Sequence, residues 1–237
     1  MPENKTVSGL DFDAIRCLGI PLAEKLSLLE DWSEESWPDF KTLYNDLVER
    51  LTLSGATQYA PVTGTSLMPF LLPDSDGHLR NSRDFLAKGP LVVSFNRGHW
   101  CPYCQLELLA LEEIHSKIAQ RNGSIISITP QRGCSAKTLR DKVEPSFPVL
   151  CDIDNAYALA SGLMMFIGDA VSQAYKDFGI DLAADQGNDG MFLPVPATYV
   201  VNEEGMIVAD YVHPDFRKRM APQDILQALD TLAIPVS

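Results

Sequence analysis

The chain has 237 residues, 46% of them hydrophobic, which is enough for one large domain or for a domain with an extension. Its formal net charge of −13 repels phosphate backbones and argues against nucleic-acid binding. No apolar run reaches transmembrane length, and the first residues lack the charged-then-apolar pattern of a signal peptide, so we expect no membrane contact.

The first part of the chain, residues 1–59, lacks strand signals and carries leucines at helical spacing. Two such series, in 22–29 and 40–51, are separated by Trp37-Pro38. We therefore expect residues 1–59 to form a helical N-terminal extension that packs on a domain formed by residues 60–237.

Strand signals begin after residue 60. Residues 70–79 predict a hairpin with a polar turn. An apolar strand follows at 91–96, then a helix that ends near Asn122-Gly123, and then a strand at 124–128. Two strands joined by a helix form a βαβ unit, so these two strands are expected to be parallel.

The rest of the chain alternates helices and strands. We expect a helix at 135–144, a short extended segment at 147–151, helices at 155–162 and 169–178, a loop at 181–192, a hairpin of strands 197–201 and 206–212, and a terminal helix from Pro222. This order is that of a thioredoxin fold with an insertion. The predicted fold class is therefore α/β and thioredoxin-like, with a central mixed sheet flanked by helices.

The segment Cys101-Pro102-Tyr103-Cys104 places two thiols between the strand at 91–96 and the helix that follows. A helix N-terminus favours the thiolate, which is the reactive form of cysteine. Pro102 suits the first helical position. We expect Cys101 to be the more exposed and more acidic thiol, and Cys104, one turn inside, to be close enough to form a disulfide with it.

Two other interpretations of this pair have to be weighed. A zinc site needs two more ligands, but the remaining cysteines and the four histidines are scattered along the sequence. Structural packing of both thiols is disfavoured by their place at a helix start, beside Trp100. Redox chemistry is therefore favoured, with no metal and no bound organic cofactor. Five cysteines are too few for a disulfide scaffold, which favours a reducing, cytoplasmic setting.

Three segments resemble bacterial peroxiredoxin-like proteins of the alkyl hydroperoxide reductase / thiol-specific antioxidant (AhpC/TSA) family. They are FNRGHWCPYCQLEL from Phe95, FPVLCDIDNAYALASGL from Phe147 and LPVPATYVVNEEG from Leu193. The resemblance runs from about residue 60 to 233 and implies a thioredoxin fold and thiol-dependent peroxide reduction. It also implies that Cys101 is the peroxidatic cysteine, which forms a sulfenic acid, and that Cys104 resolves it. A thioredoxin- or glutaredoxin-type donor would then reduce the disulfide, and a homodimer is expected by analogy.

The sequence departs from the family pattern in three places. The proline and threonine that usually precede the nucleophile are replaced by Ser94 and Gly98, and by an ungapped count Pro196 stands where the family has its active-site arginine. Arg97 is the nearby cation that could lower the thiol pKa and bind a peroxide oxygen; the alternative is a solvated loop arginine. Trp100 is expected to pack under the thiol turn.

A second element of the site is expected at Val195-Pro196, directly before the strand at 197–201. In a thioredoxin fold this proline is usually cis and faces the cysteine pair, so the resemblance implies that Val195 offers its backbone to a partner chain beside Cys101. The alternative is an ordinary trans-proline at a strand edge. Cys134 is either an alternative resolving thiol or an incidental surface cysteine, whereas Cys17 and Cys151 are expected to pack as small side chains.

Three functions remain open from the sequence. The first is a thiol peroxidase that uses Arg97, Cys101 and Cys104 to reduce hydrogen peroxide or organic hydroperoxides. The second is a general thiol-disulfide oxidoreductase, which the CPYC motif and Val195-Pro196 would suit. The third is a non-enzymatic interaction protein, against which the intact cysteine pair argues.

Overall fold

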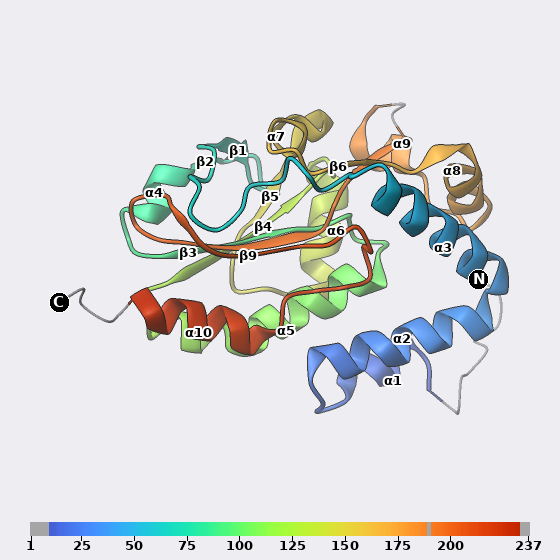
Figure 1. Cartoon of the computed structure of the whole chain (residues 1–237), viewed down its shortest axis with the longest axis horizontal. Helices are drawn as coiled ribbons and strands as arrows, with labels where there is room; N and C mark the ends of the chain where they lie inside the picture. The colour runs from blue at the N-terminus through green and yellow to red at the C-terminus, as the bar shows by residue number, and fades with distance from the viewer. Residues whose placement is uncertain (1–9, 189–190, 233–237) are drawn as a thin grey trace.

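The computed structural model describes residues 10–188 and 191–232. Its N-terminal part consists of the helices α1 (Phe12–Cys17), α2 (Leu22–Ser36) and α3 (Pro38–Leu53), as Figure 1 shows. Asp11 caps α1 by accepting a hydrogen bond from the Ala14 backbone N–H at 2.8 Å. Pro38 begins α3 in the first turn, where a missing N–H leaves no bond unmade.

The centre of the described chain is a five-stranded mixed sheet with the order β5-β4-β3-β8-β9. Strands β3 (Leu91–Phe95), β4 (Ser124–Thr129) and β5 (Val149–Cys151) are parallel. Strands β8 (Ala197–Val201) and β9 (Ile207–Val212) form the expected antiparallel hairpin, with β8 beside β3. The predicted α/β, thioredoxin-like fold is confirmed, including the parallel β3–β4 pair.

Side chains that alternate along the strands form two hydrophobic cores. One face of the sheet packs on α5 (Pro102–Ala119), α6 (Gly133–Val143) and α10 (Pro222–Leu232), and Figure 1 shows α5 and α10 side by side on that face. The other face packs on α4 (Ser82–Leu86) and α7 (Ala156–Ala160). The remaining elements are β1 (Leu71–Pro73), β2 (Leu79–Asn81), η1 (Ile153–Asn155), β6 (Met164–Phe166), α8 (Gly168–Asp177), α9 (Leu182–Gln186) and β7 (Phe192–Pro194).

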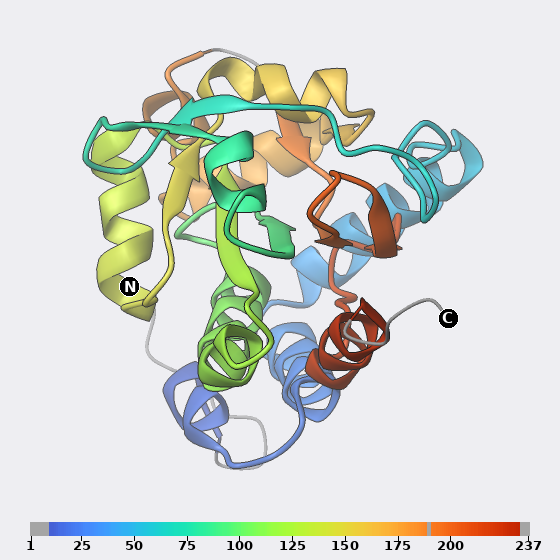
Figure 2. The same cartoon turned by 90° about the vertical axis from the view of Figure 1, so that its left-hand side faces the viewer.

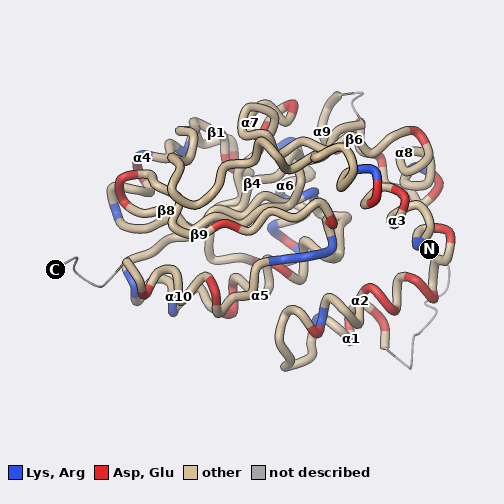
Figure 3. The backbone as a smooth tube through the Cα atoms, in the orientation of Figure 1, with Lys and Arg blue, Asp and Glu red and all other residues tan. Residues whose placement is uncertain are grey.

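The helices α1 to α3 pack against the end of the molecule at which α5 begins. Buried side chains of α1 and α2 form one cluster with the first turns of α5, and α3 packs on α8. Both views place α2 beside α5 (Figures 1 and 2). Arg217 belongs to the basic segment between β9 and α10 that Figure 3 shows. Its Nη1 forms an ion pair with Oε1 of Glu30, in α2, at 2.9 Å. The expected boundary at residues 59 and 60 stays a prediction.

The segment 181–192, expected to be a loop, contains regular structure. Asp181 caps the short helix α9 by accepting a hydrogen bond from the Ala184 N–H at 3.0 Å. Strand β7 begins at Phe192 and pairs antiparallel with β6. No helix within the described ranges has the length and apolar character needed to cross a membrane.

Candidate active site

The two thiols lie where β3 turns into α5. Cys101 is the N-cap residue of α5, Pro102 begins the helix, and the Cys104 N–H donates to the Cys101 carbonyl at 3.1 Å. Cys101 is 1% exposed and Cys104 is 0% exposed, and neither forms a disulfide. We expected Cys101 to be an exposed thiol, but it is almost as buried as Cys104, because helices of the N-terminal extension cover the turn.

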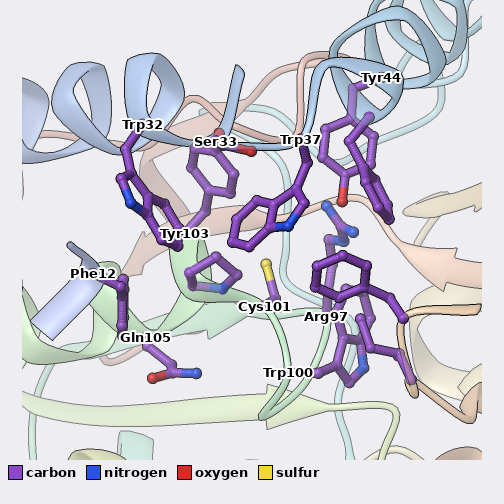
Figure 4. Close-up of a pocket in the computed structure, with 14 residues that line it drawn as sticks. Phe12, Trp32, Ser33, Trp37, Tyr44, Arg97, Trp100, Cys101, Tyr103 and Gln105 are labelled. Atoms are coloured by element: carbon purple, nitrogen blue, oxygen red, sulfur yellow. The ribbon is translucent and has the colours of Figure 1, made fainter. Parts of the chain in front are cut away.

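Cys101 nevertheless faces open space, because it lines a cavity of about 290 Å³. Figure 4 shows its sulfur directed into this cavity, toward Trp37 and beside Arg97. The other lining residues are mostly aromatic: Phe12, Trp32, Ser33, Phe40, Tyr44, Trp100, Pro102, Tyr103, Gln105, Phe178 and Ile180.

The surroundings of Cys101 favour its thiolate. Burial by itself raises the pKa of this thiol, but a hydrogen bond from Cys104 and the charges of Arg97 and Arg219 outweigh burial and lower the pKa to about 6. The N-terminus of α5 acts in the same direction. These surroundings therefore favour the thiolate of Cys101 over that of Cys104, whose pKa is raised.

Arg97 is buried at the cavity wall and is not a solvated loop arginine, being 1% exposed. One of its terminal nitrogens donates to the Tyr175 hydroxyl, whereas Nε and the other terminal nitrogen, Nη1, have no hydrogen-bond partner. Its guanidinium lies over the rings of Phe216 at 4.1 Å and Trp100 at 4.8 Å. Arg97 thus offers two free donors beside the Cys101 sulfur.

Cys104 lies in a different environment. Burial raises its pKa well above the ordinary value, and the neighbouring Cys101 thiolate acts in the same direction. Its Sγ accepts hydrogen bonds from the Arg97 backbone N–H and from Nη2 of Arg219, both at 3.3 Å. In the reduced protein Cys104 is therefore the protonated thiol that supports the Cys101 thiolate.

Sequence reasoning missed Arg219 and its partner Glu107. Arg219 Nε donates to Glu107 Oε2 at 2.5 Å, and both side chains are at most 3% exposed. Glu107 Oε1 also accepts hydrogen bonds from Thr198 at 2.8 Å and Ser94 at 3.3 Å. The available signals were a carboxylate among the apolar residues of 106–111 and a basic run, 217–219, in an acidic chain.

Gly98, where the family usually has threonine, adopts a backbone conformation that suits glycine. Its φ is +132°, and a Cβ at this position would lie 2.9 Å from the Gln131 side chain and 2.9 Å from Trp100 Nε1. The same loop is fixed by the His99 N–H, which donates to Gln131 Oε1 at 2.7 Å.

The cis geometry expected at Val195-Pro196 is wrong, because none of the described residues has a cis peptide bond. Val195 is 0% exposed and donates its N–H to the Leu163 carbonyl at 2.7 Å. Pairing of β6 with β7 holds this segment against Met164, so the Val195 N–H is already used within the chain. A partner-binding role for Val195 and Pro196 remains a prediction only.

The other cysteines do not adjoin the pair. Cys134 is the second residue of α6 and is exposed, Cys17 ends α1 and is exposed, and Cys151 is buried in β5. Cys151 therefore packs in the core as expected, whereas Cys17 does not pack inside. Among the residues that the structure describes, no group of three or more His, Cys, Asp or Glu side chains is placed to hold a metal ion.

A thioredoxin-like sheet with an acidic thiol at the start of the following helix defines a thiol-dependent oxidoreductase. The particular family follows from a sequence comparison: the model of the AhpC/TSA family matches residues 63–210. The chain therefore belongs to the AhpC/TSA family, as the resemblance predicted. A comparison with curated protein sequences finds no significant match.

Several solved structures with a similar fold are peroxiredoxins. Peroxidoxin BcpB from Mycobacterium tuberculosis has a TM-score of 0.56 at 18% identity, and the match covers 72% of this chain and 97% of the BcpB chain. A mutant of peroxiredoxin 6 from Arenicola marina has a TM-score of 0.59 at 15% identity, over 73% and 74%. AhpC from Enterococcus faecalis has a TM-score of 0.55 at 16% identity, over 73% and 92%. Family and fold together support a peroxiredoxin-type peroxidase.

Proposed function

We propose that the chain is a thiol peroxidase that reduces hydrogen peroxide or an organic hydroperoxide with Cys101 as its nucleophile. The observation that supports this most directly is the thiolate of Cys101, with a pKa of about 6, on the floor of a cavity beside the two free donors of Arg97. A thiolate is the form that attacks peroxide, and a fixed cation stabilises the oxygen on which charge develops.

In the first step the Cys101 thiolate attacks the distal oxygen of the peroxide. An S–O bond forms, the O–O bond breaks, and the departing alkoxide or hydroxide takes up a proton to become an alcohol or water. Arg97 Nε and Nη1 would donate to the peroxide oxygens in this step. Cys101 is oxidised to a sulfenic acid, and the peroxide is reduced.

In the second step Cys104 resolves the sulfenic acid. Its thiolate attacks the Cys101 sulfur, an S–S bond forms, and the S–O bond breaks as hydroxide, which takes up the proton lost by Cys104. A thioredoxin- or glutaredoxin-type donor, supplied with electrons from NADPH, would return the disulfide to two thiols. Since Cys101 is 1% exposed, that donor can reach the disulfide only after the cavity wall rearranges.

A general disulfide oxidoreductase is less well supported. That function needs a sulfur and a neighbouring backbone edge that another protein can reach. Here the Val195 N–H is bonded to the Leu163 carbonyl, and both thiols are buried.

We also propose a cytoplasmic location, since the five cysteines are free thiols. A homodimer stays a prediction by analogy.

Mass spectrometry after one equivalent of peroxide tests the proposal. The reduced wild type is expected to form an internal Cys101–Cys104 disulfide. Cys104→Ser is expected to hold a sulfenic acid on Cys101 that dimedone traps. With thioredoxin, thioredoxin reductase and NADPH, peroxide should drive NADPH oxidation that Cys101→Ser abolishes. The proposal fails if Cys101 is not oxidised faster than free cysteine.

A further inference from the structure

The wall of the cavity opposite Cys101 comes from the N-terminal extension. Phe12 of α1, Trp32 of α2, Trp37 between α2 and α3, and Phe40 and Tyr44 of α3 all line it, and Figure 4 shows several of these rings above the sulfur. All of them precede residue 63, where the match to the family begins. The extension is therefore part of the site of this chain, and its role goes beyond the family-matching segment.

The aromatic wall is held rigidly by contacts between its own rings. The Trp32 and Trp37 rings are 4.6 Å apart and edge-to-face, and Trp37 meets Phe178 at 5.1 Å in the same way. Phe40 meets Phe178 at 5.2 Å. Such pairs fix ring orientation, so the wall is a preformed apolar surface.

The charged side chain that lines the cavity, Arg97, lies beside the reacting sulfur, at what we call the polar end; Ser33 and Gln105 line other parts of the cavity. Arg97 is fully buried and keeps Nε and Nη1 unpartnered, which points to a ligand with hydrogen-bond acceptors at this place. A cavity of about 290 Å³ with one polar end and one apolar wall is much larger than hydrogen peroxide requires.

We propose that the extension binds the organic part of the substrate, and that the substrate class is a hydroperoxide carrying an aromatic ring. The hydroperoxide group would meet Cys101 and Arg97, and its ring would pack among Trp32, Trp37 and Phe178. This inference rests on the proposed peroxidase function. Hydrogen peroxide and compact alkyl hydroperoxides would fill only the polar end of the cavity.

Two commercial hydroperoxides isolate the contribution of the ring, because cumene hydroperoxide has a phenyl group where tert-butyl hydroperoxide has a methyl group. Rate constants for Cys101 oxidation are measured on the full, pre-reduced chain by quenching, alkylation and mass spectrometry. We expect the cumene compound to react at least about tenfold faster than the tert-butyl compound. A ratio near one, with Cys101 still oxidised, overturns the substrate class and leaves the peroxidase function intact. If neither compound nor hydrogen peroxide oxidises Cys101, the peroxidase function itself is overturned.

Variants locate the effect in the wall. Trp37→Ala is expected to lower the ratio of the two rate constants about fivefold, and Trp37→Phe, which keeps a ring, less than twofold. Phe192→Ala removes an exposed ring that does not line the cavity and should keep the wild-type ratio. Equal ratios in Trp37→Ala and Phe192→Ala contradict the proposal.

A binding measurement is independent of any reaction. The three tryptophans of the chain, Trp32, Trp37 and Trp100, all line the cavity, so intrinsic fluorescence reports on it directly. We expect 2-phenyl-2-propanol, the alcohol product of the cumene compound, to change this fluorescence saturably. tert-Butanol should have no such effect at the same concentrations. Identical, non-saturating responses to both alcohols contradict binding of the ring.

An independent observation concerns the resolving thiol. Arg219 Nη2 lies 3.3 Å from Cys104 Sγ, and Glu107 together with the Phe216 carbonyl holds the guanidinium in place. While Cys101 is a thiolate, the positive charges of Arg97 and Arg219 stabilise the anion on the Cys101 sulfur. Once Cys101 is a neutral sulfenic acid, Cys104 is the sulfur that Arg219 can stabilise as an anion.

We infer that Arg219, positioned by Glu107, stabilises the Cys104 thiolate in the resolving step. This inference also rests on the proposed function. In Arg219→Met the sulfenic acid, trapped by dimedone after one equivalent of peroxide, should live about tenfold longer than in the wild type. Arg219→Lys should recover part of the rate, and Glu107→Gln should slow the step less than Arg219→Met.

The pH dependence separates this role from a structural one. Because Arg219 would lower the pKa of Cys104 in this state, the pH at which the resolving rate levels off should be higher in Arg219→Met than in the wild type. Rate profiles that level off at the same pH, or a sulfenic acid with the wild-type lifetime, contradict the inference. If no sulfenic acid forms in either protein, the peroxidase proposal fails instead.

Discussion

Arg97 and Arg219 are both buried within hydrogen-bonding or charge range of the cysteine pair, yet they are held in opposite ways. Arg219 is satisfied by Glu107 and by the carbonyls of Phe216 and Lys218. Arg97 lies among aromatic rings with two donor nitrogens unused. A buried cation with every donor bonded serves the fold and the adjacent sulfur, whereas one with free donors is ready for a ligand.

Stability should separate the two arginines most strongly. Removing Arg219 leaves the Glu107 carboxylate buried without its cation, so Arg219→Met should lower the free energy of unfolding by about 3–5 kcal/mol. Arg97→Met removes a charge that is only partly paired and one hydrogen bond, to Tyr175, so it should cost only about 1–2 kcal/mol. Urea unfolding of the reduced proteins measures both. Equal losses would remove the distinction between the two sites.

The peroxide step should reverse that order. Arg97→Met is expected to slow oxidation of Cys101 by about a hundredfold, as removal of a donor from an oxyanion site does. Arg219→Met should slow the same step by less than about tenfold, because it acts on Cys101 through charge alone. Stopped-flow rates with limiting peroxide give the comparison, and a larger effect of Arg219 would contradict it.

The acidity of Cys101 offers a third measurement. Alkylation by iodoacetamide should follow a titration with a midpoint near pH 6 in the wild type. Arg97→Met should raise that midpoint by about one pH unit, because an opposite charge is lost. A wild-type midpoint near that of free cysteine would remove the basis of the enzymatic proposal.

The last comparison concerns the pH dependence of folding. The pKa of Cys101 falls from 9.0 to about 6 in the folded protein, so the thiolate stabilises the fold fully above pH 9 and loses this contribution as the pH falls toward 6. The difference in free energy of unfolding between reduced wild type and Cys101→Ser should therefore grow with pH in this range, by at most about 1.4 kcal/mol per pH unit. A flat difference would indicate an ordinary thiol.

Local patterns were enough to predict much of this molecule. The apolar strand, the CPYC turn and the amphipathic helix follow one another within 91–119, so sequence spacing alone placed Cys101 at the helix start. The hairpin of β8 and β9 was likewise local. Strands β6 and β7 were missed because each has three residues and their pairing depends on a segment far away in the sequence.

The rest of the site depends on contacts that no local pattern contains. Arg219 meets Glu107 across a separation of 112 residues, and neither residue has a nearby signal of the other. The helical periodicity of 22–51 predicted a buried face but not that its aromatic side chains would cover Cys101. The cis-proline was carried over from the resemblance, and this chain instead uses the Val195 N–H in its own hydrogen bonding.

The glycine at position 98 also limits how this site could be redesigned. Its backbone angle of +132° and the 2.9 Å approach of Gln131 and Trp100 to a Cβ leave no room for a branched hydroxyl residue. Grafting the customary threonine into this loop would therefore displace the very indole that borders Arg97. Introducing the usual peroxide-binding hydroxyl would require changes to the loop, Gln131 and Trp100 together. A single substitution therefore cannot convert the glycine-containing loop into the threonine-containing one.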